Sequence, residues 1–301
     1  MRLGIPRFGI YSKLIQSLAA ELGIDIVMPP KITPDIVQAG VANSSDMVCF
    51  PFKVTLGQFI WCLENGATDL VNWDNQGLCR QKHYYQLQEL ILKDLGYKFR
   101  MHPVSKGNAL LKAQELFGLS KMNMLARVWT IYQSLLDAER QAYGGSGWPR
   151  IGVVGEIYTV LEPEVNLDIL GKLRRMGAAV DVSVKISDFI RHNFLGEEDH
   201  LKEQEEAKRL LSAEIGGHGF HSIYNTIWYA KNGYDGVVHL MPLSCMPEST
   251  VEPVIDHVAR QYGIPLYRFP IDESISERAL NTRLETFVSM LRGRSESLSR
   301  H

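Results

Sequence analysis

Cysteines are the residues of this chain with the most distinctive chemistry, and three of the four lie in short segments next to predicted strands or helices. Cys49 precedes a Phe-Pro pair, Cys79 follows a predicted strand at 69–73, and Cys245 lies in the segment 242–247. Thiolates are soft ligands that suit iron–sulfur clusters and zinc. Because the sequence has no C-x-x-C pair, spacing alone leaves both a metal site and simple burial open for these three residues.

Cys62 differs from the other cysteines because it lies in the apolar helical segment 59–63. A free cysteine in such a segment behaves as a small buried hydrophobe. We therefore expect a structural role for Cys62, and it is a reserve ligand only if Cys79 is not one.

Lys53 and Glu156 are further polar candidates. Lys53 follows Cys49 by four residues and could offset an anionic group or hold a phosphate, although a lysine at a helix start is usually exposed. Glu156 follows a predicted strand and could be an acid or base, with a helix cap or salt bridge as an equal alternative. The glycine-rich segment 216–221 could bind an anion at a helix start, but the sequence lacks the G-x-x-x-x-G-K-[ST] nucleotide loop.

The composition is that of an ordinary soluble protein, with 301 residues, 45% of them hydrophobic and 22% charged. This length suits two domains of about 150 residues each. A formal charge of -2 predicts no binding to nucleic acid or to an anionic membrane. We recognise no signal peptide and no apolar stretch of the roughly 18–20 residues that span a bilayer, so we expect a cytoplasmic protein. A reducing cytosol makes disulfides a poor explanation for the cysteines.

Short apolar segments alternate with helical patterns along the chain, which predicts parallel sheets. A stretch rich in glycine at 143–150 interrupts the alternation, and we place a boundary there between domains 1–147 and 148–301. The expected fold is α/β, with two similar doubly wound parallel-sheet domains of the Rossmann or flavodoxin type. The expected elements include a strand at 97–102 and helices at 54–64, 81–95, 164–176 and 249–262.

Ligands of doubly wound sheets bind outside the carboxyl ends of the strands. Cys49, Cys79 and Cys245 are all expected in loops at such ends, two in the first half of the chain and one in the second. A cleft shared by the two halves is therefore the location that we predict for a common site.

Longer motifs resemble the activase-related proteins of the 2-hydroxyacyl-CoA dehydratase group. The resemblance extends over nearly the whole chain. It rests on Gly4-Ile5-Pro6-Arg7, Cys49-Phe50-Pro51-Phe52-Lys53 with Gly57, Gly155-Glu156-Ile157-Tyr158, Tyr234-Asp235-Gly236-Val237-Val238, Cys245-Met246-Pro247-Glu248, Ile271-Asp272-Glu273 and Thr282-Arg283-Leu284-Glu285-Thr286-Phe287.

The resemblance implies a [4Fe-4S] cluster in the cleft between two α/β domains, held by three loop cysteines that match Cys49, Cys79 and Cys245. The fourth iron would take a non-cysteine ligand such as solvent or substrate. From their own positions in the sequence, Glu156 and Lys53 are the candidates for catalytic roles. The resemblance also implies an oxygen-sensitive protein that forms a homodimer or heterodimer. A separate ATP-hydrolysing activase would pass it a low-potential electron.

The function that the resemblance implies is low-potential reductive chemistry, such as the radical dehydration of a 2-hydroxyacyl-CoA. Two alternatives remain open at this point. One is a non-catalytic electron-transfer or cluster-carrying partner of a larger dehydratase or reductase. The other is a small-molecule-binding α/β protein with zinc on the same cysteines.

Overall fold

The structure is a computed structural model that describes residues 1–73, 78–117, 121–192, 196 and 198–298. The chain divides into two compact units, Met1–Arg140 and Gln141–His301, and each is described by itself. The helices of the described residues are each too short or too polar to cross a membrane.

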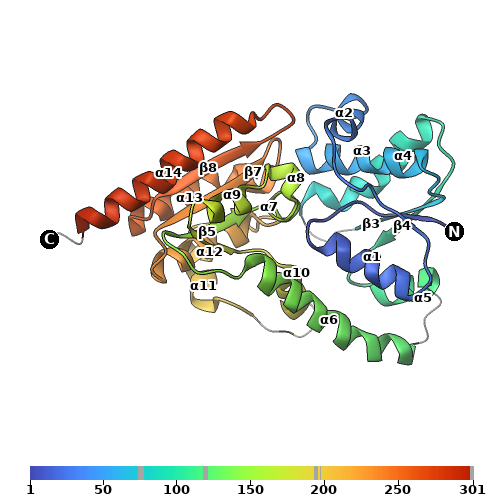
Figure 1. The fold of residues 1–301 in the computed structure, drawn as a ribbon, viewed down its shortest axis with the longest axis horizontal. Coiled ribbons are helices and arrows are strands. Elements are labelled where there is room, and N and C mark those ends of the chain that lie inside the picture. The colour runs from blue at the N-terminus through green and yellow to red at the C-terminus, as the bar shows by residue number, and fades with distance from the viewer. Residues whose placement is uncertain (74–77, 118–120, 193–195, 197, 299–301) are drawn as a thin grey trace. The chain divides into compact units, whose positions relative to one another are not determined.

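Unit 1 is built on a four-stranded sheet in which every strand is parallel to its neighbours (Figure 1). The order across the sheet is β2 (Ile26–Val27), β1 (Leu3–Gly4), β3 (Asp69–Trp73) and β4 (Arg100–Val104). The second strand is added on one side of the first, and the third and fourth strands are added on its other side. The order of strand addition therefore switches sides between β1 and β3. Such a switch is where doubly wound folds place their ligands.

The helices of unit 1 lie on both sides of this sheet. α2, α3 and α4 lie on one side, and α1 and α5 lie on the other (Figure 1). The long α6 starts in this unit and continues past its end. The elements are α1 (Tyr11–Glu21), α2 (Pro34–Ala42), α3 (Phe50–Glu64), the short 3-10 helix η1 (Arg80–His83), α4 (Tyr84–Asp94), α5 (Ala109–Phe117) and α6 (Lys121–Tyr143).

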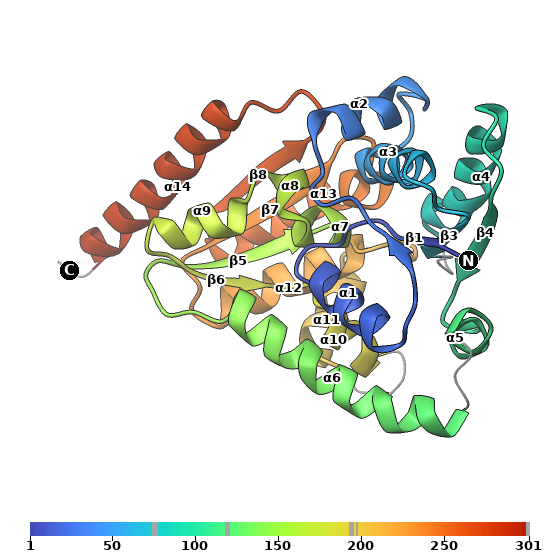
Figure 2. The same cartoon turned by 45° about the vertical axis from the view of Figure 1, so that its right-hand side comes forward.

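Unit 2 repeats the topology of unit 1. Its parallel sheet has the order β6 (Ala179–Val182), β5 (Arg150–Gly155), β7 (Gly236–Pro242) and β8 (Leu266–Ile271), which is again second, first, third and fourth strand (Figure 2). Strands β5 and β7 are almost wholly buried, as expected for the central strands of a sheet covered on both faces.

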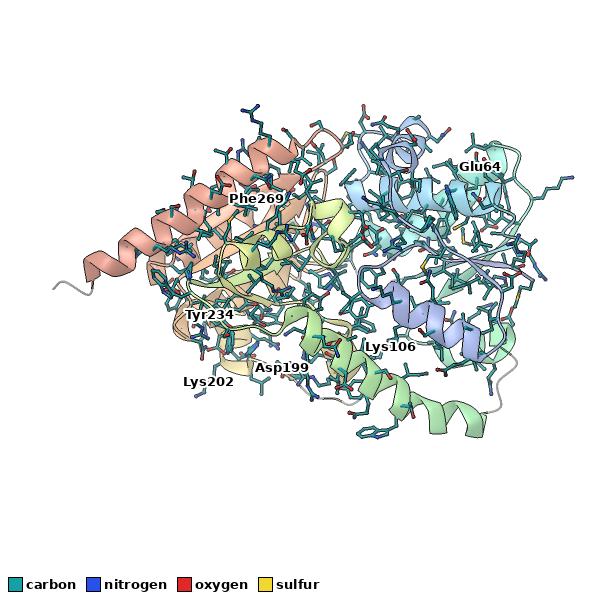
Figure 3. The ribbon with its side chains drawn as sticks, in the orientation of Figure 1. Glu64, Lys106, Asp199, Lys202, Tyr234 and Phe269 are labelled. Atoms are coloured by element: carbon teal, nitrogen blue, oxygen red, sulfur yellow. The ribbon has the colours of Figure 1, made fainter. Side chains whose placement is uncertain are left out.

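Helices cover both faces of the second sheet. α9 packs against α14 on one face, and α12 packs against α13 on the other (Figure 2). Phe269 of β8 is fully buried in this unit (Figure 3). The elements are α7 (Ile157–Leu161), α8 (Pro163–Asn166), α9 (Ile169–Arg175), α10 (Ile186–Ile190), α11 (Leu201–Arg209), α12 (Gly219–Lys231), α13 (Met246–Tyr262) and α14 (Glu277–Leu298).

The α/β class and the parallel sheets predicted from the sequence are confirmed, whereas several element boundaries were wrong. The helix expected at 164–176 is broken, because Leu167 and Asp168 adopt left-handed backbone angles, with φ of 56° and 55°. Asp168 then caps α9 by accepting a hydrogen bond from the backbone N–H of Gly171. The strand expected at 97–102 begins later, at Arg100.

Two helices begin earlier than the sequence indicated, and both changes concern a cysteine. The helix expected at 54–64 begins at Phe50, and the helix expected at 249–262 begins at Met246. Cys49 and Cys245 are therefore the capping residues of helices. A proline in the first turn explains the difference, since proline is tolerated there and does not end a helix.

The position of α3 depends on two glycines at its crossing with α2. A Cβ atom on Gly57 would lie 1.8 Å from the carbonyl oxygen of Ile36, and one on Gly40 would lie 1.8 Å from the carbonyl oxygen of Lys53. Neither approach is possible for a residue with a side chain. The two glycines therefore let the backbones of α2 and α3 touch along the first half of α3.

Replacing Gly57 by alanine should destabilise unit 1 by about 1–3 kcal/mol or more, because α2 and α3 must separate to admit the methyl group. This loss should outweigh the better helix propensity of alanine. Urea unfolding followed by circular dichroism measures the effect. Gly145→Ala is the control, since a Cβ there meets no described atom within 4 Å. Equal stability of the two variants would contradict the proposed role of the crossing.

Candidate functional site

Cys49 lies directly before the first residue of α3. Its backbone is extended, with φ of -70° and ψ of 153°, and its carbonyl oxygen accepts a hydrogen bond from the N–H of Phe52. The residue is buried, and its side chain makes no capping hydrogen bond to the first turn. A thiol at a helix N-terminus lies near the positive end of the helix dipole, which favours the thiolate that binds metals.

The sulfur of Cys49 contacts the hydroxyl of Tyr84, the first residue of α4. The two atoms, Sγ of Cys49 and Oη of Tyr84, are 2.7 Å apart. Burial raises the pKa of the Tyr84 hydroxyl well above its usual range, and negative charge on Cys49 and on Cys79 raises it further. Tyr84 therefore keeps its proton beside both cysteines. No local sequence pattern indicated a role for Tyr84.

Cys79 precedes the short helix η1, which leads directly into α4. Its backbone is also extended, and the sulfur is only half-buried. Arg80 donates a hydrogen bond of 3.1 Å to the carbonyl oxygen of Met47, two residues before Cys49. The segment that carries Cys79 is thus attached to the segment that carries Cys49, and unit 1 brings two of the predicted ligands into one region.

Lys53 lies one turn further along α3 than Cys49, and it is buried with only 2% of its surface exposed. This burial differs from the solvent-exposed position that is usual for a lysine at a helix start. Its Nζ atom is 3.9 Å from a carboxylate oxygen of Asp46, whose own side chain is almost fully exposed. A buried ammonium group places positive charge next to the Cys49 segment, where it could offset an anion.

Cys245 follows β7 through a tight turn. The N–H of Cys245 donates to the carbonyl oxygen of Pro242 at 3.0 Å, and Ser244 adopts a left-handed conformation with φ of 60°. Left-handed backbone is uncommon for a residue other than glycine. The turn directs Cys245 into the capping position of α13, where it is buried.

Cys79 and Cys245 occupy equivalent positions in the two units. Each follows the third strand of its sheet, β3 or β7, and each directly precedes a helical turn. Cys49 and Cys245 share a different feature, since both are followed by one residue and then a proline in the first helical turn. Both units therefore present thiols at helix starts on the carboxyl edge of the sheet.

Three buried polar side chains form a hydrogen-bonded group near the start of α13, the helix that follows Cys245. Glu248, in the first turn of α13, accepts a hydrogen bond of 2.9 Å from the Ser222 hydroxyl, and its same oxygen is 2.8 Å from Nε2 of His239. All three side chains are buried, and they join α12, β7 and α13. The available signal was His239, a lone polar residue within the apolar strand β7.

Glu156 is the capping residue of the short helix α7. Its carboxylate accepts hydrogen bonds from the N–H groups of Tyr158 and Thr159 and from the Thr159 hydroxyl. Burial raises the pKa of Glu156 above its ordinary value, the hydrogen bonds oppose this shift, and the nearby Glu248 adds to it. These contacts are those of a helix cap, which was one of the two roles expected for Glu156.

One glycine of the segment 216–221 is required by helix packing. A Cβ on Gly219 would lie 2.7 Å from the carbonyl oxygen of Pro247, so glycine lets α12 approach the start of α13. Burial lowers the pKa of His218 to about 3 and that of His221 to about 4. Both rings are therefore neutral near pH 7 and offer no positive charge to an anion.

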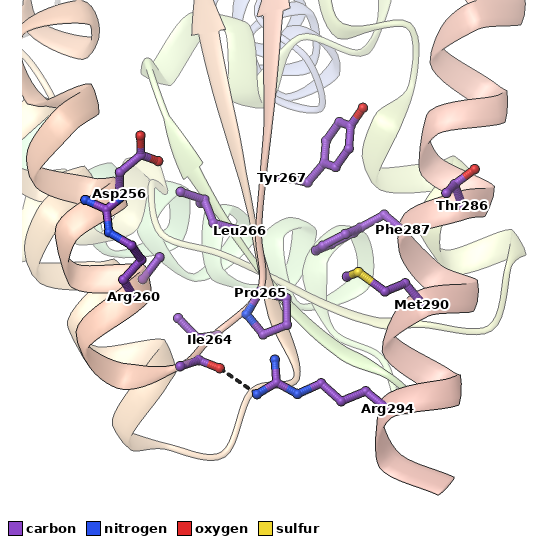
Figure 4. Close-up of a pocket in the computed structure, with 12 residues that line it drawn as sticks. Asp256, Arg260, Ile264, Pro265, Leu266, Tyr267, Thr286, Phe287, Met290 and Arg294 are labelled. Carbon is purple, nitrogen blue, oxygen red and sulfur yellow. Dashed lines mark hydrogen bonds between the residues drawn. The ribbon is translucent and has the colours of Figure 1, made fainter. Parts of the chain in front are cut away.

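A cavity of about 580 Å³ lies in unit 2 between α13 and α14 (Figure 4). It adjoins Pro265 and Leu266 at the amino end of β8, and Arg294 donates to the carbonyl oxygen of Gly263 at its rim. Because the strands are parallel, this is the edge of the sheet opposite to the end of β7 that leads to Cys245. The cavity is therefore separate from the predicted site.

Cys62 lies in the core of unit 1. It is fully buried, and its thiol donates a hydrogen bond of 3.2 Å to the carbonyl oxygen of Val27. Its Cβ is also close to the place that a side chain on Gly4 would need. These contacts fit the structural role expected for Cys62.

The three predicted ligands are divided between the units, with Cys49 and Cys79 in unit 1 and Cys245 in unit 2. Within the described ranges, no three His, Cys, Asp or Glu side chains are arranged so that they could hold a metal ion. Comparison with protein-family models and with curated protein sequences found no match.

The thiols should differ in their reactivity toward iodoacetamide in the native, metal-free protein. Burial raises the pKa of Cys62 to about 12, so this thiol should stay protonated and unreactive at mildly alkaline pH. Its reaction rate should rise only as the pH approaches that value. Mass spectrometry of timed samples should find the half-buried Cys79 modified before Cys62. Equally fast modification of Cys62 would contradict its assignment to the core.

Proposed function

We propose that this protein is an iron–sulfur redox protein of the 2-hydroxyacyl-CoA dehydratase type, with a [4Fe-4S] cluster on Cys49, Cys79 and Cys245. One observation carries the proposal, which is that these thiols all precede helical turns on the carboxyl edge of a parallel sheet. The carboxyl edge of a parallel sheet is where doubly wound folds bind their ligands.

The chemistry of the donor set fits such a cluster. Iron–sulfur clusters are held by thiolates, and a helix N-terminus favours the thiolate form. Cys49 and Cys245 occupy the N-cap positions of helices of 15 and 17 residues. A structural zinc site needs four ligands, so three cysteines alone do not complete one.

A buried lysine would help to hold the negatively charged cluster. Buried Lys53 would offset part of its negative charge beside Cys49. The bound cluster would supply low-potential electrons for reductive chemistry, such as radical dehydration of a 2-hydroxyacyl-CoA, with one iron open to substrate. A separate ATP-hydrolysing activase would reduce it, since the sequence has no nucleotide loop of its own.

Single alanine substitutions test the ligand set. After anaerobic purification, Cys49→Ala, Cys79→Ala and Cys245→Ala should each lose most of the iron and the visible absorption of the wild type. Cys62→Ala should keep both, because Cys62 contacts the core. Circular dichroism verifies that each variant is folded. A folded variant of the first three with full iron content would remove that cysteine from the ligand set.

Reduction by an ATP-hydrolysing activase separates an enzyme from an electron carrier. We expect ATP-dependent reduction of the cluster, seen as a change in its visible and paramagnetic resonance spectra. Addition of a 2-hydroxyacyl-CoA should then reoxidise the cluster or yield the dehydrated thioester if the protein is an enzyme. Reduction with no response to any acyl-CoA would favour the carrier alternative over catalysis.

A further inference from the structure

The hydroxyl of Tyr84 lies 2.7 Å from the sulfur of Cys49, and its ring is held in place by a neighbouring aromatic side chain. Its ring packs edge-on against Phe52, with centroids 4.8 Å apart and an angle of 78° between the planes. Phe52 is fully buried in the first turn of α3, the same turn that Cys49 caps. The ring therefore has little freedom to move away from the sulfur.

Gln88, one turn further along α4, fixes the backbone that carries Tyr84. Its side-chain amide donates to the carbonyl oxygen of Phe52 at 3.3 Å and to the Thr55 hydroxyl at 2.8 Å. Its carbonyl oxygen accepts a hydrogen bond of 2.5 Å from Asn72 of β3. Gln88 is completely buried, and its hydrogen bonds attach α4 to both α3 and β3.

The direction of the bond between Tyr84 and Cys49 follows from the chemistry of a ligand. A cysteine that binds a metal is deprotonated, so its sulfur can only accept hydrogen bonds. Tyrosine carries one O–H group, and its ordinary pKa near 10 keeps that group intact at neutral pH. Tyr84 must then be the donor, across the 2.7 Å between the two atoms.

We propose that Tyr84 is a positioning residue that donates a hydrogen bond to the Cys49 sulfur and makes the group bound there easier to reduce. This inference rests on the proposed function above. Hydrogen bonds to ligand sulfurs withdraw electron density from the cluster and raise its reduction potential. The protein would thereby adjust its potential with a side chain that is not itself a ligand.

Tyr84→Phe removes the hydroxyl and leaves the ring against Phe52. The variant should keep the iron and sulfide content of the wild type and shift the midpoint potential of the cluster to a more negative value. Tyr85→Phe is the matched control, one position further along α4, and should leave the potential unchanged. Potentiometric titration followed by paramagnetic resonance measures this shift. A potential equal to that of the wild type in a fully loaded Tyr84→Phe variant would overturn the proposal.

A second readout does not need the cluster. In metal-free full-length protein, loss of the hydrogen bond should slow the alkylation of Cys49 several-fold at neutral pH. The thiolate is the reactive form, and less of it forms when the Tyr84 hydroxyl no longer stabilises it. The Tyr85→Phe variant should react at the wild-type rate. Unchanged alkylation in Tyr84→Phe would overturn the contact itself. If the wild type binds no iron while this readout behaves as expected, the proposed function fails and the contact between Tyr84 and Cys49 stands.

Discussion

Parallel pairing of every strand is the constraint on which the rest of each unit depends. When all strands run the same way, each connection must return along the sheet as a helix, and the helices after the strands begin at the carboxyl edge. In both units the first and third strands are neighbours in the sheet although they are not consecutive in sequence. The loops that follow two such strands lead to opposite faces of the sheet, which leaves a crevice where ligands bind. Cys79 and Cys245 follow the third strand of their sheets because of this repeated topology.

The close contact between α2 and α3 determines the surroundings of Cys49. Gly40 and Gly57 allow α2 and α3 to touch, and the resulting contact buries Lys53 in the first turn of α3. A buried ammonium group is costly unless negative charge lies near it. Asp46 lies 3.9 Å from the Lys53 ammonium, and an anionic group bound near Cys49 would add negative charge to the same surroundings.

The sequence predicted what depends on local pattern. Alternating apolar segments gave the parallel sheets, and the apolar neighbours of Cys62 indicated its burial. Long-range contacts had no such signal: Tyr84 reaches Cys49 across 35 residues, and the burial of Lys53 depends on α2, which the sequence analysis did not identify. The break at Leu167 was also hidden, because leucine rarely adopts a positive φ and tertiary contacts override its preference.

The proposed chemistry depends on whether the chain binds an iron–sulfur cluster. The most direct test of this binding is elemental analysis of the wild-type protein, purified without oxygen, for iron, acid-labile sulfide and zinc. A [4Fe-4S] protein should contain about four iron and about four sulfide per chain, with little zinc. Zinc without sulfide, or no bound metal after reconstitution with iron and sulfide, would contradict the proposal.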